Sequence, residues 1–198
     1  MLHLCIMKFN RPIILASKSP RRSQLLREMG FEFEVKTMDI EESYPSSLKT
    51  EDIAAFLAEK KAKGSKSLIT GNEVLITADT IVALGDIIFG KPQNYDHAFQ
   101  MIRKLSGKKH QVITGVCIMT KSQNFVFSDI AHVYFDELTD AEIDYYITNY
   151  KPYDKAGSYA IQEWIGLTKI KKIEGSYFTI MGLPTHLVYK QLLSLNVF

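Results

Sequence analysis

The chain has 198 residues, of which 46% are hydrophobic and 23% are charged, and this composition excludes an intrinsically disordered protein. Its 24 Lys and Arg residues against 22 Asp and Glu residues leave a net charge of +2, which is too small to predict a general nucleic-acid or membrane surface. The apolar run within Met1–Asn10 is shorter than a signal-peptide core or a membrane span, so we expect a cytoplasmic protein with no membrane partner.

Strands and helices are predicted to mix along the chain. The first elements are a strand at Pro12–Ala16, a helix from Pro20 that stops at Gly30 with Ser19 as its N-cap, a strand over Phe31–Val35, and a helix from Thr50 to Gly64. They are followed by a strand over Val74–Val82, a Gly85-Asp86 turn, a strand at Ile87–Phe89, and a helix from Asn94 to Leu105. The last are a hairpin of Gln111–Met119 and Phe125–Phe135, a helix opened by the Thr139 capping box, and a C-terminal helix opened by Leu183-Pro184.

This order predicts an α/β or α+β protein with a mixed, twisted sheet and flanking helices, rather than a bundle, a sandwich or a barrel. No repeat or linker divides the sequence, so we expect residues 1–198 to form a single domain with two lobes around a cleft. Cys5 and Cys117 lack the spacing of metal ligands and the density of a disulfide framework. Both are expected to be reduced, buried thiols.

The segment Ser17–Arg22 follows a strand and begins a helix, which brings free backbone N–H groups and three cations into one small region. The guanidinium groups of Arg21 and Arg22 match phosphate oxygens with paired, charge-assisted hydrogen bonds. This composition is typical of a polyphosphate site. The alternative is a solvated basic turn, which is a common surface feature.

Asp79 directly follows five mostly apolar residues, and a carboxylate is costly to bury there without a partner or a task. We therefore expect Asp79 at the edge of a cleft, and the alternative is a carboxylate that caps a neighbouring turn. Lys91 lies in Gly90-Lys91-Pro92, where glycine permits close approach and proline stiffens the loop. By residue type alone, Glu42 and Lys61 are compatible with simple exposed charge.

Three segments rich in Gly, hydroxyl and amide groups suggest a pocket that reads a base: Gly157–Gln162, Gly175–Tyr177 and Gly182–Pro184. A pair of structural turns is an equally good interpretation. The five histidines show no zinc-ligand spacing. Neither a G-x-x-x-x-G-K-[ST] motif nor a G-x-G-x-x-G motif occurs, so the phosphate signal belongs neither to a P-loop nor to a Rossmann fold.

In order, these segments resemble the Maf family of nucleotide pyrophosphatases from Ile14 to Leu193. The matching motifs are L-A-S-K-S-P-R-R from Leu15, I-E-E from Ile40, L-A-E-K-K-A from Leu57, A-D-T-I-V from Ala78, G-K-P from Gly90, L-S-G from Leu105, H-Q-V-I-T-G-V from His110, K-A-G-S-Y-A-I-Q from Lys155 and G-L-P from Gly182. The resemblance implies a two-lobed α/β fold with a deep central cleft, related to the inosine triphosphate pyrophosphatases and often assembled as a homodimer.

The resemblance also implies hydrolysis of a nucleoside triphosphate to monophosphate and pyrophosphate with Mg²⁺ or Mn²⁺. It assigns the catalytic base to Asp79 and a metal-side carboxylate to Glu42, so that the metal ligands are Glu42 and Asp79. It assigns phosphate contacts to the cations Arg21, Arg22, Lys61 and Lys91. Its catalytic residues are Asp79, Glu42 and Lys91, and Ser17, Thr80 and Gln162 are expected to contact the substrate. Such clamps suit a triphosphate of nearly four negative charges.

Arg21, Thr80 and Gln162 resemble the branch of the family that acts on dTTP and UTP, in which the Gln amide can read a pyrimidine edge. Asp136 and Thr179 depart from the usual pattern of Arg and Asn at those places, which bears on the preference for one pyrimidine. The alternative function is a nucleotide-binding regulator of cell division and septum formation, which has no need of a catalytic carboxylate. A single-stranded nucleic-acid binder would need a basic groove with interleaved aromatic residues, and the sequence lacks one.

Overall fold

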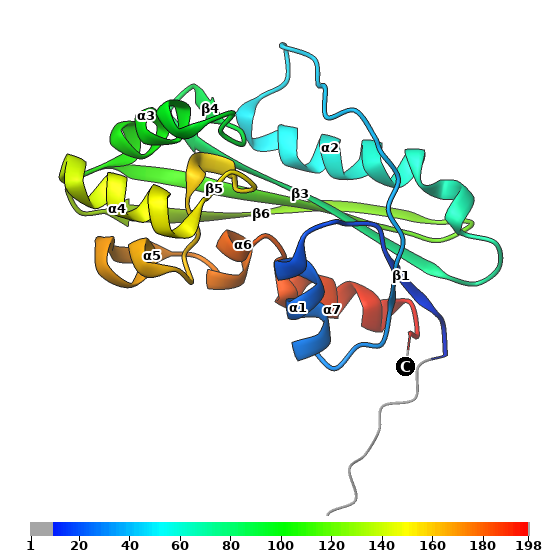
Figure 1. The fold of residues 1–198 in the computed structure, drawn as a ribbon. Coiled ribbons are helices and arrows are strands. Elements are labelled where there is room, and N and C mark those ends of the chain that lie inside the picture. Colours follow the sequence, from blue (N-terminus) through cyan, green and yellow to red (C-terminus); the bar gives the residue numbers. More distant parts are fainter. Residues whose placement is uncertain (1–9, 198) are drawn as a thin grey trace, which may run out of the picture.

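The computed structural model describes residues 10–197 (Figure 1). Met1–Phe9, which include Cys5 and nearly all of the N-terminal apolar run, lie outside this range. The strands are β1 Ile13–Leu15, β2 Glu34–Val35, β3 Val74–Leu84, β4 Ile87–Phe89, β5 Lys109–Met119, β6 Asn124–Phe135 and β7 Ile170–Glu174. The α-helices are α1 Pro20–Glu28, α2 Thr50–Gly64, α3 Tyr95–Leu105, α4 Asp140–Tyr150, α5 Trp164–Lys169, α6 Tyr177–Met181 and α7 Thr185–Ser194, with 3₁₀ turns η1 at Lys66–Leu68 and η2 at Ala156–Ser158.

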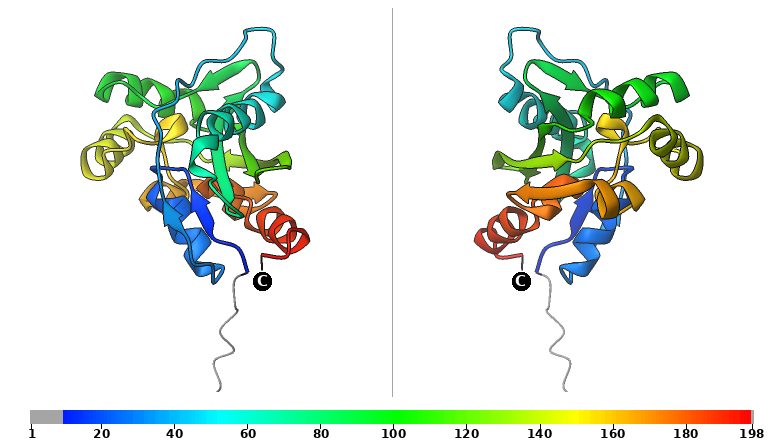
Figure 2. Two further views of the ribbon diagram at one scale, coloured as in Figure 1. Left: turned by 90° about the vertical axis from the view of Figure 1, so that its right-hand side faces the viewer. Right: turned by 90° about the vertical axis from the view of Figure 1, so that its left-hand side faces the viewer.

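One seven-stranded sheet organises the chain, in the order β2-β1-β3-β5-β6-β7, and β4 adds to β3. The pairs β1–β2 and β1–β3 are parallel, whereas the remaining pairs are antiparallel. The mixed sheet and the predicted β5–β6 hairpin are therefore confirmed. Helix α2 covers one face of the long strands, while α1, α6 and α7 lie on the other (Figures 1 and 2).

The alternation of side chains along β3 divides the core between these two faces. Ile76 and Ala78 belong to a cluster with residues of α1 and α7, such as Leu26 and Leu192. Ile81 points to the other face and packs with Leu57 of α2. Since successive strand residues face opposite ways, Asp79 shares its face with Ile81, and Thr80 shares its face with Ala78.

Most of the predicted helix ends are found in the structure. Asn94 accepts a hydrogen bond from the His97 backbone N–H, and Thr139 and Glu142 form the expected capping box. The N-cap role predicted for the Ser19 side chain is wrong, because that side chain makes no cap hydrogen bond. Instead, Ser17 Oγ accepts from the Ser19 backbone N–H at 3.3 Å.

The strand predicted over Phe31–Val35 is shorter than expected, since only Glu34–Val35 pairs with β1. Phe31 is buried in the core beside α1, and its backbone N–H donates to the Leu26 carbonyl at 3.2 Å, which closes the end of that helix. Cys117 is buried as expected, and its thiol contacts Asn124 Oδ1 at 2.8 Å. Within residues 10–197, no helix has both the length and the apolar content needed to cross a bilayer.

Candidate active site

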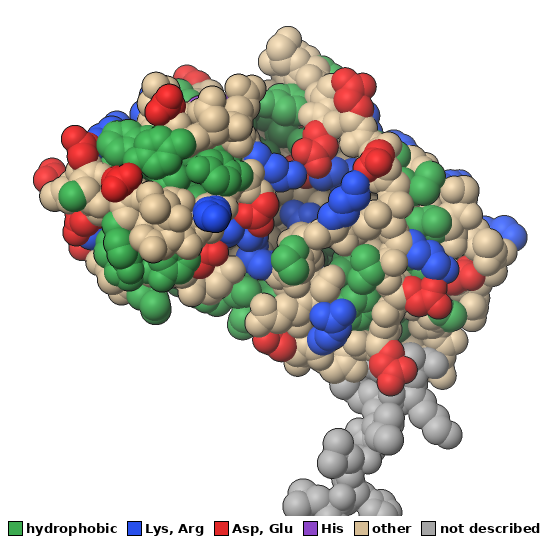
Figure 3. All heavy atoms as spheres, in the orientation of Figure 1, with side chains coloured by type: hydrophobic (Ala, Val, Ile, Leu, Met, Phe, Trp, Pro, Cys, Tyr) green, Lys and Arg blue, Asp and Glu red, His purple; other side chains and the backbone are tan. Residues whose placement is uncertain are grey.

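A cavity of about 690 Å³ opens in the middle of the molecule, and all nine predicted site residues line it: Ser17, Arg21, Arg22, Glu42, Lys61, Asp79, Thr80, Lys91 and Gln162. Figure 3 shows this hollow with Lys and Arg side chains around it and acidic side chains at its rim. Residues separated by more than 140 positions in the sequence thus meet in one place. The roles assigned to them remain predictions.

An interruption at the edge of the sheet explains where the cavity lies. Strand β1 pairs with β3 only as far as Ile76, and β4 pairs with β3 only from Val82 onward. Among residues 10–197, no strand pairs with this edge of β3 between these two residues. Asp79 and Thr80 lie in this interval, so the side chains on both faces of β3 reach the cavity. Asp79 is 8% exposed and lies within the strand opposite Gly115, so the alternative interpretation of it as a turn cap is wrong.

Glu42 and Asp79, the two predicted carboxylates of the site, converge on one ammonium group. Lys61 Nζ lies 2.7 Å from Glu42 Oε1 and also donates a hydrogen bond to Asp79 Oδ1. Burial alone would raise the pKa of Glu42, but the hydrogen bond and charge of Lys61, with smaller contributions from Lys91 and Arg22, hold it below its usual value. The surrounding positive charges therefore favour the charged form of Glu42.

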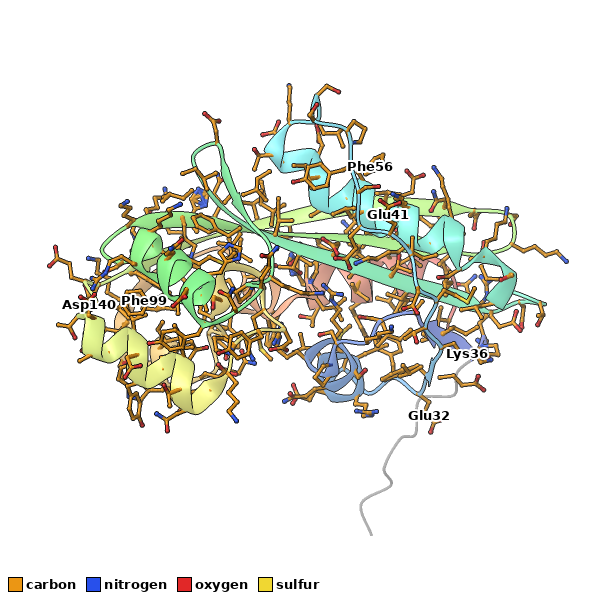
Figure 4. All side chains as sticks on the ribbon, turned by 45° about the horizontal axis from the view of Figure 1, so that its top comes forward. Glu32, Lys36, Glu41, Phe56, Phe99 and Asp140 are labelled. Atoms are coloured by element: carbon orange, nitrogen blue, oxygen red, sulfur yellow. The ribbon has the colours of Figure 1, made fainter. Side chains whose placement is uncertain are left out.

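Glu42 is supplied by the long connection between β2 and α2, and its neighbour Glu41 lies on that connection where it runs past α2 (Figure 4). Lys61 is on the last turn of α2, where a cation complements the negative end of the helix dipole. Helix α2 is therefore the element that brings Lys61 to Asp79. The exposed-charge alternative fails for Lys61, whose side chain is only 17% exposed.

Arg22 forms a hydrogen bond with the backbone of β3 at this unpaired edge of the sheet. Its NH1 donates to the Ala78 carbonyl at 2.8 Å and to Ser17 Oγ at 3.1 Å, and its Nε donates to the Gly182 carbonyl at 2.9 Å. The fourth bond runs from NH2 to Thr80 Oγ1 at 3.1 Å. Burial lowers the pKa of Arg22, while the nearby Asp79 acts in the opposite direction. Because an arginine stays protonated in proteins, a half-buried cation remains in the lining of the cavity.

Other cations line the same cavity and differ in how they are paired. Arg21 NH1 lies 3.5 Å from Asp154 Oδ2, and Lys18 pairs with the exposed Asp39. Lys91 is exposed and forms no ion pair or hydrogen bond with any of residues 10–197, although its charge helps to lower the pKa of Glu42. These side chains are available to an anion that enters from solvent.

Only part of the predicted base pocket assembles. Tyr159, Ala160 and Gln162 line the cavity together with Gly182, as expected for two of the three segments. Gly175–Tyr177 does not line the cavity, so the prediction is wrong for that segment. Gly175 instead lies against the backbone of β6, where a Cβ would meet the Ile130 carbonyl at 2.9 Å.

Asp154 is a residue of the site that sequence reasoning missed. Its carboxylate pairs with Arg21 and, at 2.7 Å, with Lys155. No sequence pattern links it to Arg21, because the two are more than 130 positions apart. The atypical residues Asp136 and Thr179 lie outside the cavity lining. Asp136 forms an ion pair with Lys171.

The donor set of the site is compatible with a hard divalent cation. Among residues 10–197 there is no cluster of three or more His, Cys, Asp or Glu side chains that could hold a metal. Glu42 and Asp79 are nevertheless brought within reach of one point, since both contact Lys61 Nζ. Mg²⁺ commonly binds through one or two carboxylates plus the phosphates of a substrate, so two acids beside a phosphate site fit this ion.

Comparison with known families agrees with this geometry. The model of the family described as Maf-like protein matches residues 12–195, a range that contains every residue of the site. The chain belongs to the Maf-like protein family.

Curated relatives of this family member are similar over nearly its whole length. A dTTP/UTP pyrophosphatase from Phocaeicola vulgatus is 54% identical over 181 residues, which cover 91% of this chain and 94% of the relative. A dTTP/UTP pyrophosphatase from Flavobacterium psychrophilum is 48% identical over 185 residues, which cover 93% of this chain and 95% of the relative.

Solved structures show a more distant similarity. The Staphylococcus aureus Ham1 protein is 15% identical with a TM-score of 0.42, over 63% of this chain and 72% of that one. A nucleoside-triphosphatase described as a dITP/XTP pyrophosphatase from Mycobacterium abscessus is 16% identical with a TM-score of 0.37, over 65% and 76%.

Proposed function

We propose that this chain hydrolyses dTTP and UTP to nucleoside monophosphate and pyrophosphate in the cytoplasm, with a divalent cation as cofactor. The observation that carries the proposal is the meeting of Asp79 and Glu42 with cations from separate segments around one cavity. Membership of the Maf-like family and the names of its relatives support the reaction and the substrate class.

The chemistry requires that a highly charged leaving group be stabilised. Water attacks the α-phosphorus, the bond from this phosphorus to the α–β bridging oxygen breaks, and pyrophosphate departs with that oxygen. Asp79 accepts the proton of the attacking water, which is the role of a general base. Arg21 and Lys91 contact the phosphate oxygens, since neither is tightly held by protein acceptors.

Lys61 and Glu42 surround the proposed base. Lys61 positions the Asp79 carboxylate in the cavity through their hydrogen bond. Glu42, whose pKa is lowered mainly through Lys61, supplies a second negative charge at neutral pH. Glu42 and Asp79 would hold the divalent ion, which supplies charge neutralisation for the polyphosphate when it is bound.

Recognition of the base is assigned to Gln162, whose exposed side chain lies at the rim of the cavity. Its amide carries both a donor and an acceptor and so matches the edge of a uracil or thymine ring. Single hydrogen bonds of this kind contribute about 1 kcal/mol each, which gives about fivefold selectivity per bond.

The proposal is tested by incubating the purified chain with dTTP, UTP and the other common nucleoside triphosphates in Mg²⁺ or Mn²⁺. Pyrophosphate and orthophosphate are measured separately. We expect pyrophosphate from dTTP and UTP, loss of activity in EDTA, and recovery on addition of the metal. Release of orthophosphate would refute cleavage at the α–β bond. Tight binding with no hydrolysis would instead favour the regulator of cell division, which needs the cations but not Asp79.

The proposal treats residues 1–198 as one domain of two lobes that assembles as a homodimer and binds neither nucleic acid nor membrane. The continuous seven-stranded sheet supports the single domain. The dimer is tested by light scattering of the full chain, in which a mass twice that of the 22.6 kDa chain is expected.

A further inference from the structure

A chain of hydrogen bonds runs inward from the floor of the cavity through three elements. It begins at Arg22 NH2, which lies 3.1 Å from Thr80 Oγ1 on β3. Thr80 Oγ1 lies 2.9 Å from Thr114 Oγ1 on β5, and Thr114 Oγ1 lies 2.7 Å from the Thr179 carbonyl oxygen in α6. Thr114 is fully buried and does not line the cavity.

The direction of every bond in this chain is fixed by its two ends. The Thr179 carbonyl can only accept, so the single hydroxyl hydrogen of Thr114 is used there. Thr114 must then accept from Thr80, which uses the only hydroxyl hydrogen of Thr80. Thr80 in turn can only accept from Arg22, whose guanidinium has no acceptor of its own. The order is therefore Arg22 to Thr80 to Thr114 to the Thr179 carbonyl.

This order limits what Arg22 and Thr80 can offer to a substrate. The hydroxyl hydrogen of Thr80 is already donated inside the protein. Arg22 has five N–H groups, and four of them are donated to neutral acceptors of the protein. The charge of Arg22 is thus available to an anion, while its orientation is fixed by the protein.

The same contacts also hold one wall of the cavity. Helix α6 has five residues and ends at Gly182, whose φ is 107°. Two carbonyls at its C-terminal end accept hydrogen bonds from side chains outside the helix: Thr179 from Thr114, in addition to the Gly182 backbone N–H, and the C-cap Gly182 from Arg22. The fit around Gly182 is close, since a Cβ there would lie 3.3 Å from Thr80 Oγ1. Ile180, Met181 and Gly182 line the cavity, so the chain of bonds connects this wall to β3 and β5.

We propose that Thr114 is a positioning residue for the reaction: through Thr80 it fixes the guanidinium of Arg22, and through the Thr179 carbonyl it fixes the α6 wall. The expected effect on turnover rests on the proposed function, whereas the chain of hydrogen bonds does not depend on that function. Thr80 is assigned here to the same positioning role rather than to a direct substrate contact.

The test is Thr114→Val, which keeps the branched shape and removes the hydroxyl. Two buried hydrogen bonds are lost, so we expect kcat/KM for dTTP to fall about ten- to a hundredfold. Thr114→Ser retains the hydroxyl and should restore most of this loss. Thr80→Val breaks the same chain and should show a similar loss. The double variant should be no worse than the more impaired single variant, because both act on one unit.

Thr120→Val is the matched control. Thr120 is also buried, directly after β5, and its hydroxyl accepts from the Gln123 backbone N–H at 3.0 Å, in the hairpin turn outside the cavity lining. Its removal should lower thermal stability without changing kcat/KM. An equal loss of kcat/KM in this control, or no rescue by Thr114→Ser, would show that Thr114 acts only through general stability.

A readout that does not need turnover separates this inference from the proposed function. The Nε–H proton of Arg22 should exchange slowly with solvent in NMR spectra, and its exchange should be at least tenfold faster in Thr114→Val than in Thr114→Ser. Binding of inorganic pyrophosphate, followed by calorimetry, should weaken in the same order. Unchanged exchange and binding in Thr114→Val would overturn the inference. Absence of nucleotide hydrolysis by the wild type, with these differences present, would overturn only the proposed function.

Discussion

Glu42 Oε1 lies 2.7 Å from Lys61 Nζ, and this contact holds a carboxylate on a long loop against the end of helix α2. The proximity of the ammonium group lowers the pKa of Glu42 against the opposing effect of burial. The pH dependence of the enzyme should therefore respond to Lys61.

Replacement of Lys61 by Gln removes the main interaction that lowers the pKa of Glu42. The pKa of Glu42 should rise, so the protonated form should persist to higher pH than in the wild type. If ionised Glu42 is required, the acidic limb of the kcat/KM profile should move to higher pH, together with a lower maximum. Profiles of both proteins measure this. Lys63→Gln is the control, because Lys63 pairs with Glu59 on the surface of the same helix. An acidic limb that does not move would contradict the role of Glu42.

Asp79→Asn keeps the size of the side chain and removes its ability to accept a proton. Turnover should fall by about a hundredfold to ten-thousandfold, the usual contribution of a general base. Nucleotide affinity should be retained or increased, since one negative charge near the polyphosphate is lost. Turnover and calorimetric affinity are the measurements, with Asp86→Asn in the exposed β3–β4 turn as the control. A folded Asn variant with more than about a tenth of normal turnover would remove Asp79 from the mechanism.

Gln162→Ala should raise KM for dTTP and UTP more than it lowers kcat. A side chain that reads the base contributes to ground state and transition state alike, and its loss therefore appears mainly in KM. We expect about a tenfold effect on pyrimidine nucleotides and a smaller one on purine nucleotides. The comparison requires KM and kcat for both classes. Equal losses for all nucleotides would mean that Gln162 does not read the base.

Gly115→Ala should destabilise the fold through helix α2. A Cβ at Gly115 would lie 2.2 Å from the Ala54 backbone, so the helix would have to move away from β5. Such overpacking costs about 1 to 3 kcal/mol. Urea denaturation measures the loss, and activity should fall as well, because α2 carries Lys61. Gly71→Ala is the control, since its Cβ would meet only Glu73 carboxylate oxygens at 3.7 Å or beyond. Equal stability of the two variants would contradict the close approach of helix and strand.

His110 should make the fold sensitive to mild acid. It is 2% exposed, its Nε2 lies 2.7 Å from Tyr159 Oη, and burial lowers its pKa to about 4. In the unfolded chain the pKa is about 6.5, so below that pH the unfolded state binds more protons and stability falls with falling pH until about pH 4. Between pH 7 and pH 5 the loss is about 2 kcal/mol.

This loss is obtained from urea denaturation at the two pH values. His110→Gln has no imidazole to protonate and should lack this component, whereas His186→Gln, at an exposed histidine, should retain it. The same pH dependence in the wild type and His110→Gln would show that His110 is not the source.

The order of elements was predictable because periodicity, capping residues and glycines act over a few neighbouring positions. The contacts of Thr139 with Glu142, and of Asn94 with the His97 N–H, are local in this sense. Both helix starts could be predicted from the sequence. Phe31 was misassigned to a strand for the opposite reason, since its position is set by the core beside α1, which the alternation of Phe31–Val35 does not reveal.

The identity of the site residues was predictable from ordered motifs, but their relationships were not. The sequence alone determined that cations and a carboxylate would be present. Only the tertiary structure decided that Lys61 would lie between Glu42 and Asp79, that Asp154 would face Arg21, and that the open edge of β3 would receive the Arg22 guanidinium. These contacts join residues 18 to 133 positions apart, and their distances depend on how helices and strands pack, which no local pattern specifies.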